Sequence, residues 1–404
     1  MNKKINQEKS ILLLYIFCII QIIFVNESAY TLYIFRAYKA AIIFDIILLL
    51  FTIYKIFIGK VNFYKLSILM FLFFSIFVIN SMIINNDLNT ENFLVVNAII
   101  NGFIISSIFD IKTYLKVFKN CIIFFCIYGL IVTYIMLPLK MTSFFTLYHN
   151  PFTNIPYYNA GFSFVMGWNG LMRLQGIFRE PGVFQIYILL AIMIELFIDN
   201  KNAKNIGILL VSMIMTFSTS LFVSLIPFLL AYILTQDKGK VKFFIPVLLL
   251  LVLLYCNTDI RNYFMRSISK LVVGSTQSTD VRYNSIKYLL ETSLRHPIFG
   301  NSYVNGYLFI RDYYSLPANY DITGTFFTNI MATGYISGGA IIYIFYKFIK
   351  DTFYRKKIIV AFLLFLSLFL SICSQNIVYS SILWTFIFFE IKNMTIERSI
   401  KNEK

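Results

Sequence analysis

The chain has 404 residues, of which 59% are hydrophobic and only 13% are charged, whereas an ordinary globular domain carries roughly 25% charged residues. Its net charge of +16 comes mainly from lysines; we interpret these as markers of membrane orientation that contact anionic lipid heads, and no stretch resembles a nucleic-acid-binding module. Only two histidines are present and none of the five cysteines forms a CxxC pair, which argues against a disulfide framework and against a metal centre.

Apolar runs of about 20 residues, each long enough to cross a bilayer, recur along the chain. They predict an all-α polytopic membrane protein that forms a single integral membrane domain, 1–404. The interval 205–235 is divided into two short helices at Thr216-Phe-Ser-Thr-Ser220, because lysines flank both of its ends. The first span is interpreted as a signal anchor. The predicted spans, about twelve in number, are 11–26, 40–58, 66–84, 93–110, 120–138, 182–198, 205–219, 221–235, 243–257, 324–346, 358–374 and 377–391.

Lysine placement sets the orientation, since cytoplasmic loops are enriched in positive charge. Lysines cluster before the first span, after the second, before the fifth and at the C-terminal tail, whereas the loop 85–92 has no basic residue. Both termini are therefore predicted in the cytoplasm. Two large loops, about 139–181 and 258–323, are predicted outside the cytoplasm.

The arginines are concentrated in these two outside loops, where positive charge is normally depleted. The planar guanidinium fork suits phosphate, because it donates paired hydrogen bonds. A membrane protein with arginines on this side is predicted to handle an anionic molecule there. Seven of its ten arginines lie in the two loops: Arg173, Arg179, Arg261, Arg266, Arg282, Arg295 and Arg311.

The densest motif is Arg173-Leu-Gln-Gly-Ile-Phe-Arg179-Glu180-Pro181-Gly182. Pro181 suits the first turn of a helix, and a helix N-terminus favours anions. Two arginines beside such an end predict a phosphate or pyrophosphate site. Glu180 is either a general base or an ion-pair partner that holds Arg173 or Arg179 in place. The alternative is that the whole cluster only anchors the helix at the membrane border.

A second motif runs from Ser278 to Pro297 and predicts a surface helix that is capped at 278–280 and ends near Arg295. One face of this helix is polar, whereas Arg282 falls on the apolar face, where it reaches either lipid phosphate or a buried ligand. The polar stripe comprises Asp280, Asn284, Lys287, Glu291 and Arg295, and the apolar face comprises Ile286, Leu289, Leu290 and Leu294.

A third motif, Asn319-Tyr320-Asp321-Ile-Thr323-Gly324, lies at the mouth of the tenth span. Asp321 is either catalytic or a helix N-cap. Two further carboxylates, Asp45 and Glu195, fall inside spans, where a transport role competes with pairing at the interface, and we favour the pairing. Tyrosines and Trp168 in the outside loops are candidates for stacking on sugar rings.

In this order, the three motifs resemble the bacterial O-antigen polymerase (Wzy-type) and O-antigen ligase group. The residues that carry the resemblance are Arg173 to Gly176 with Glu180-Pro181, then Arg282 through Pro297-Ile-Phe-Gly300, then Asp321 followed by Gly334-Tyr-Ile-Ser-Gly338. The resemblance covers the whole chain in layout and about a quarter of it in motif. Ligases of this group carry a His-Asn pair before the late span, where this chain has Asn319-Tyr320-Asp321, and this difference favours the polymerase.

The resemblance implies a C-type glycosyltransferase of the bacterial plasma (inner) membrane, with its active site facing the periplasm or the cell exterior. It would use neither a nucleotide sugar nor a metal or other cofactor. Its substrates would be oligosaccharides on undecaprenyl pyrophosphate, and its product O-antigen, capsule or another surface glycan. Candidate partners are membrane lipids and a chain-length regulator and flippase of the same pathway. Arg173, Arg179 and Arg282 would stabilise the departing pyrophosphate, and Glu180 or Asp321 would be the base. Further substrate contacts are expected from Arg266, Arg295, Arg311, Gly176, Asn319 and Tyr320.

Three other functions compete with this one. A ligase that moves finished chains onto lipid A core is the closest. A flippase or polysaccharide exporter should show charges deep in several spans and inverted repeats, whereas the charges here cluster in loops and no repeat is visible. A transporter of a small anion is disfavoured for the same reason.

Overall fold

The computed structural model describes residues 2–402 apart from 25–27, 36, 58, 60, 62, 142, 144, 150–155, 167–171, 200, 236–276 and 318–321. It is mostly helical and divides into two compact units, each built from segments that are distant in sequence. Unit 1 contains Met1–Phe118, Asn284–Asp351 and Gln375–Lys404. Unit 2 contains Lys119–Tyr283 and Thr352–Ser374.

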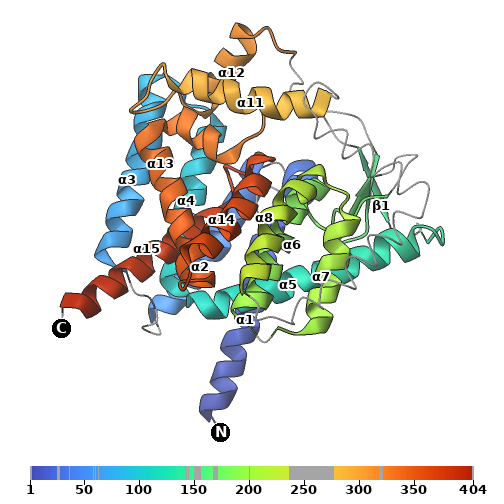
Figure 1. Ribbon diagram of the computed structural model, residues 1–404. Coiled ribbons are helices and arrows are strands. Elements are labelled where there is room, and N and C mark those ends of the chain that lie inside the picture. The colour runs from blue at the N-terminus through green and yellow to red at the C-terminus, as the bar shows by residue number, and fades with distance from the viewer. Residues whose placement is uncertain are drawn as a thin grey trace. The chain divides into compact units, whose positions relative to one another are not determined.

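The α-helices and strand β1 are labelled in Figure 1. Those that lie mainly in unit 1 are α1 (Asn2–Phe24), the π-helix η1 (Tyr30–Phe35), α2 (Ala37–Phe57), α3 (Lys65–Ile84), α4 (Thr90–Ile108), α11 (Gln277–Ser293), α12 (Tyr303–Tyr313), α13 (Thr325–Phe353) and α15 (Ser381–Asn402). Those that lie mainly in unit 2 are α5 (Ile111–Ile131), the π-helix η2 (Val132–Met136), β1 (Thr146–His149), β2 (Pro156–Asn159), β3 (Phe164–Met166), α6 (Pro181–Phe197), α7 (Ala203–Met215), α8 (Thr219–Thr235) and α14 (Ile358–Cys373).

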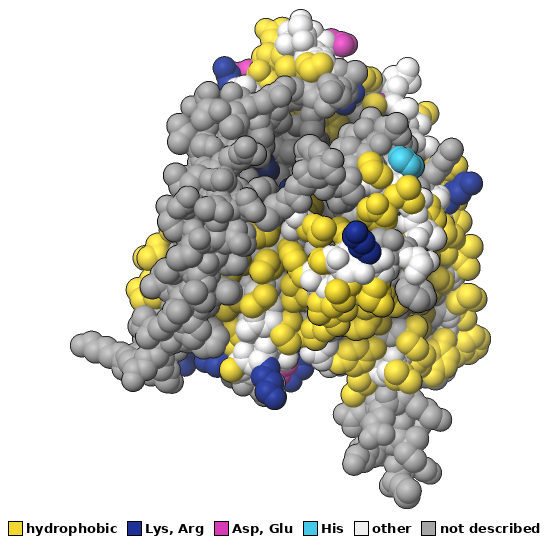
Figure 2. Space-filling view, turned by 90° about the vertical axis from the view of Figure 1, so that its right-hand side faces the viewer, with side chains coloured by type: hydrophobic (Ala, Val, Ile, Leu, Met, Phe, Trp, Pro, Cys, Tyr) yellow, Lys and Arg dark blue, Asp and Glu magenta, His cyan; other side chains and the backbone are white. Residues whose placement is uncertain are grey.

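The apolar helices identify a membrane-embedded protein. Four of them are long and apolar enough to cross a bilayer: Ala37–Phe57, Lys65–Ile84, Thr90–Ile108 and Ile111–Met136. Large hydrophobic side chains stay exposed on these helices, as at Phe57 (85%), and Figure 2 shows hydrophobic side chains over much of the described surface on one face. An exposed apolar area of this extent is expected where lipid is the solvent.

The predicted spans largely coincide with helices, although the predicted number of spans and their orientation stay predictions. Every predicted span except 243–257 falls on a helix, and 243–257 lies outside the described residues. The division of 205–235 into two helices is confirmed, because α7 ends at Met215 and α8 begins at Thr219.

A small sheet in the loop 139–181 departs from the all-α prediction. Strands β1, β2 and β3 pair antiparallel in that order, with Thr146 opposite Asn159 and Tyr157 opposite Met166. Aromatic and β-branched residues favour such short strands, but their length gives little periodicity from which to predict them. The sheet packs through Val165 on Val132, the first residue of η2.

In unit 1, helix α13 is broken at Gly334, whose φ of 83° and ψ of 169° are not helical. Residues 297–302 lie against the break and supply hydrogen-bond partners to the helix backbone there. Broken helices are tolerated at membrane depth only where other groups satisfy the freed backbone. Three bonds join the segments, from Tyr335 N to Pro297 O (2.8 Å), from Asn301 N to Met331 O (2.8 Å) and from Ser302 N to Ala332 O (3.1 Å).

Two glycines permit this close approach. A Cβ at Gly334 would collide with the carbonyl oxygen of Ile298, and a Cβ at Gly300 would collide with that of Ala332. Both glycines also have positive φ, a conformation that costs other residues energy. The Pro297-Ile-Phe-Gly300 motif and the Gly334 motif are therefore two halves of one packing contact.

The start of α12 is held by a buried carboxylate from the loop between α3 and α4. Asp87 accepts hydrogen bonds from the Ser302 hydroxyl, the Asn89 side chain and the Asn305 amide, the last at 3.1 Å. Burial raises the pKa of Asp87, but its hydrogen bonds, which include one from Asn92, outweigh burial and leave that pKa below its usual value. The carboxylate is therefore charged and caps α12.

We expect Gly334→Ala to destabilise the protein by at least about 2 kcal/mol, because it adds backbone strain to a steric clash. The measurement is unfolding of the purified protein by SDS in mixed micelles. Gly339→Ala is the matched control, since nothing lies within 4 Å of a Cβ there. Equal stability of the two variants would show that the Gly334 break is not a close contact.

Asp87→Asn should cost about 1–3 kcal/mol at neutral pH, because a charged acceptor of three hydrogen bonds is lost. The folded-state pKa is lowered, so the carboxylate's contribution is complete above the unfolded pKa of about 3.9 and is lost as the pH falls through the folded pKa. Thermal unfolding between pH 3 and pH 8 should show the variant approaching wild type only at the acid end. The exposed Asp312→Asn serves as control, and a difference that grows towards acid pH would contradict the argument.

Candidate functional site

The Arg173–Glu180 segment leads into α6 and is anchored by its neighbours in unit 2. The Tyr134 hydroxyl, in η2, donates to the carbonyls of Met172 at 2.9 Å and Met215 at 3.3 Å. The Leu174 amide donates to the Met215 carbonyl at 2.8 Å. These bonds place the segment against η2 and the C-terminal end of α7.

A tight turn at Gly176 sets the approach to α6. Its φ is 58°, and a Cβ there would lie 2.9 Å from the Phe184 ring, so the position favours glycine. The buried Gln175 side chain closes the turn by donating to the carbonyls of Phe178 at 2.7 Å and Arg179 at 2.9 Å. The turn therefore fixes the backbone of Arg179 at the start of the helix.

A second helix begins beside this segment. Arg173 Nε donates to the Thr216 carbonyl at 3.0 Å, in the turn between α7 and α8. Ser220, in the first turn of α8, donates to the Gln185 side chain of α6 at 2.7 Å. The N-terminal ends of α6 and α8 thus lie side by side, and each carries partial positive charge. Among the described residues, the two terminal nitrogens of Arg173 have no hydrogen-bond acceptor.

Glu180 is the residue that precedes α6, and its side chain is half-buried. Its backbone carbonyl accepts from the amides of Val183 and Phe184, each at 3.2 Å. Its carboxylate makes no capping hydrogen bond. No ion pair joins it to Arg173 or Arg179, all three being described residues. The predicted ion pair of Glu180 is therefore absent, and its role as a general base stays a prediction.

The structure brings together only part of the predicted set. Arg173, Gly176, Arg179 and Glu180 lie on one segment of unit 2. Among the others, Arg282 is half-buried on α11, Arg295 is exposed, and Arg311 is half-buried on α12. The predicted positions that lie outside the described residues are Trp168, Arg261, Arg266, Asn319, Tyr320 and Asp321.

The surface helix differs from its prediction at both ends. Helix α11 runs Gln277–Ser293, so it starts before the proposed caps and ends before Arg295. The predicted faces are confirmed where Lys287 and Glu291 are exposed and Leu289 is buried. Leu294 was assigned to the apolar face, but it follows the helix and is 68% exposed.

Sequence reasoning missed the contribution of the serine and threonine turn. The run Thr216-Phe-Ser-Thr-Ser220 was used only as a helix boundary, although a polar run between apolar helices also signals a polar contact. Gln175 and Gln185, both buried, were likewise missed. Comparisons with protein families, with curated proteins and with solved structures found no match to this chain.

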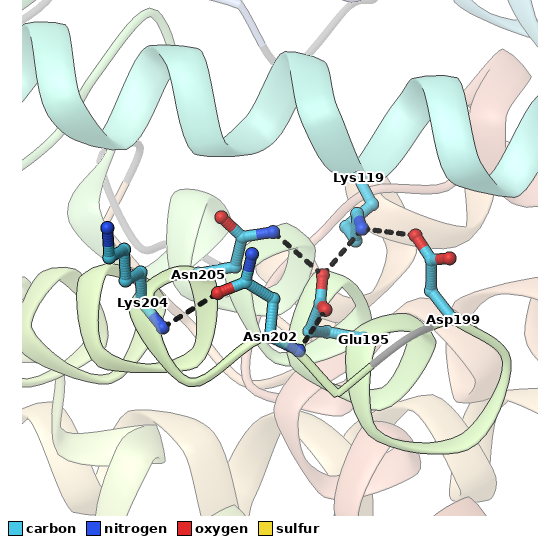
Figure 3. A network of polar contacts seen from close by, with 6 residues as sticks. All are labelled: Lys119, Glu195, Asp199, Asn202, Lys204 and Asn205. Carbon is cyan, nitrogen blue, oxygen red and sulfur yellow. Dashed lines mark hydrogen bonds and ion pairs between the residues drawn. The ribbon is translucent and has the colours of Figure 1, made fainter.

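The intramembrane carboxylates have separate partners. Figure 3 shows Lys119 of α5 between Glu195 of α6 and Asp199, at 2.5 and 2.6 Å. Glu195 also accepts from the Asn202 amide at 2.8 Å and the Asn205 side chain at 3.2 Å. Lys119 and Glu195 are both buried, so the predicted pairing is confirmed for Glu195.

Asp45 has no such cation among the described residues. The side chains of Asn97 and Asn101, both on α4, donate to its two carboxylate oxygens, the second at 3.1 Å. Asp45 is therefore paired with asparagine side chains and not with a cation. Sequence spacing did not reveal these partners, because α2 and α4 meet only in the folded chain.

Lys119→Met is expected to cost about 3–5 kcal/mol, because it leaves buried carboxylates without their cation. The double variant Lys119→Met, Glu195→Gln should recover part of this loss. Unfolding by SDS measures both, with the exposed Lys112→Met on the same helix as control. A Lys119→Met protein of wild-type stability would contradict the structural role of the ion pair.

Proposed function

We propose that this protein polymerises a surface polysaccharide at the outer face of the bacterial plasma membrane. A sugar hydroxyl of an incoming lipid-linked repeat unit attacks the anomeric carbon of the growing chain. The new C–O bond forms as the bond to undecaprenyl pyrophosphate breaks, and the hydroxyl proton passes to a base. The substrates are oligosaccharides on undecaprenyl pyrophosphate, as in the family that the three motifs resemble.

One observation carries the proposal: the N-termini of α6 and α8 lie beside the segment that carries Arg173 and Arg179. The leaving pyrophosphate gains negative charge as the bond breaks, and fixed positive charge at that point lowers the barrier. Helix N-termini supply such charge without reorganisation. The turn closed by Gln175 and Gly176 keeps this group of donors in place.

Glu180 is the base in this proposal. Its carboxylate stands beside the proposed pyrophosphate site and has no ion-pair partner among the described residues. A base must be able to take up a proton, and a carboxylate locked to an arginine would be a poor acceptor. Arg282 and Asp321 keep the roles that the resemblance implies for them, as proposals.

We predict that Arg173→Ala and Arg179→Ala each lower the rate of polymerisation by about 10²-fold or more, because each removes a donor to the developing charge. Glu180→Gln should lower it by about 10²–10⁴-fold, because the base is lost while the shape is kept. The rate is measured with purified protein and lipid-linked repeat units, and the surface-glycan ladder of complemented deletion strains gives a second measurement.

Arg355→Ala is the matched control, since this exposed arginine lies outside the segment. All variants must insert at wild-type levels. A deletion strain that leaves long chains on the lipid carrier would identify a ligase. Repeat units that accumulate facing the cytoplasm would identify a flippase, and either result would overturn the proposal.

A further inference from the structure

A row of stacked aromatic side chains runs along α11 and α12 in unit 1. We call it the aromatic strip, and its members are Tyr288, Tyr314, Tyr313 and Phe309. Tyr288 stacks on Tyr314 with ring centroids 3.8 Å apart, and Phe309 stacks on Tyr313 at 5.3 Å. Tyr313 meets Tyr314 edge to face at 4.9 Å, which joins the two pairs into one strip.

Charged groups border this strip. The guanidinium carbon of Arg295 lies 3.8 Å from the centre of the Phe309 ring. Tyr314 donates its hydroxyl to Glu291, whose side chain is 46% exposed and lies 3.9 Å from Lys287. Burial, and then the Glu291 carboxylate, raise the pKa of Tyr314, so its hydroxyl stays protonated as a donor. The strip therefore offers ring faces beside both donors and acceptors.

Arg295, which lies over the Phe309 ring at one end of the strip, also lines a pocket of about 220 Å³. Arg295 and His296 line it together with apolar side chains, which are Ile84, Pro297, Ile298 and Phe299. A site made of a narrow strip and a pocket is longer than it is wide. Such a shape suits a linear polymer better than a globular partner.

We propose that the aromatic strip binds a segment of saccharide chain. A pyranose ring has an apolar C–H face and a rim of hydroxyls. We expect its C–H face to stack on the ring of Tyr313, a residue that is 68% exposed. Its hydroxyls donate to Glu291 and accept from Lys287 and Arg295. Rigid tyrosine rings give such contacts at low cost in conformational entropy.

A membrane-interface belt is the competing explanation for exposed tyrosines. The carboxylate of Glu291 opposes it, because this group is about half exposed on the same surface and anionic lipid headgroups repel it. A saccharide hydroxyl donates a hydrogen bond to a carboxylate, whereas a lipid phosphate does not. The proposed function supplies the identity of the saccharide, but binding to the strip is a separate event from transfer.

The test is binding of oligosaccharides to the purified full-length protein in phosphatidylethanolamine–phosphatidylglycerol nanodiscs. The probe is the host's own surface polysaccharide, cut by mild acid, and the readout is saturation-transfer NMR with titration. Tyr313→Ala should weaken binding roughly tenfold, whereas Tyr313→Trp, which keeps a ring, should stay close to wild type. Leu308→Ala, an exposed apolar change on the same helix, should have no effect.

Unchanged binding by Tyr313→Ala would overturn the proposal. So would a Tyr313→Ala protein that loses only stability in the nanodisc, because that result identifies an interface belt. In cells, Tyr313→Ala should shorten the glycan ladder while single additions continue, in contrast to Arg173→Ala. If deletion leaves the ladder intact, the proposed polymerase is wrong, yet the binding measurement still decides the role of the strip.

Discussion

Every backbone polar group within a bilayer must find a hydrogen-bond partner inside the protein. In unit 1, helix α13 cannot provide all of these partners for itself, because its helical path is broken at one position. At Gly334 the path of α13 is interrupted, and residues 297–302 fill the gap with three backbone hydrogen bonds. Ser81 of α3 adds a fourth contact by donating to the Ala332 carbonyl at 2.6 Å. Because those residues lead directly into α12, the break also positions the surface that carries the aromatic strip.

The sequence predicted those features that depend on composition over many residues. Apolar runs located the helices, and the polar turn at 216–220 separated α7 from α8. Features that depend on contacts between distant segments were not predictable. Pro297 to Gly300 and Gly334 stood as separate motifs, because only the fold shows that each fills the space left by the other. Asp45 and its asparagines were missed for the same reason.

The candidate site was half predictable. Arg173, Arg179 and Glu180 were identified from their place before a predicted helix, and that helix begins where Pro181 indicated. The second helix terminus at the site was not predicted, because the start of α8 is joined to the site by bonds between distant residues, such as Gln185–Ser220 and Gln185–Ser224. A local motif reveals the residues at one helix terminus. The electrostatic potential at a bound pyrophosphate would instead depend on every helix terminus nearby.

Helix α6 shows why two carboxylates in one membrane protein have different roles. Glu180 and Glu195 stand at its two ends, roughly 22 Å apart at 1.5 Å per residue. Glu195 is buried and accepts hydrogen bonds from Lys119, Asn202 and Asn205. Its charge therefore stabilises the contacts of α6 with α5 and with the start of α7. Glu180 lacks such partners among the described residues and is half-buried. A carboxylate without a fixed cation can instead contact a substrate hydroxyl, and such a contact is what a general base requires.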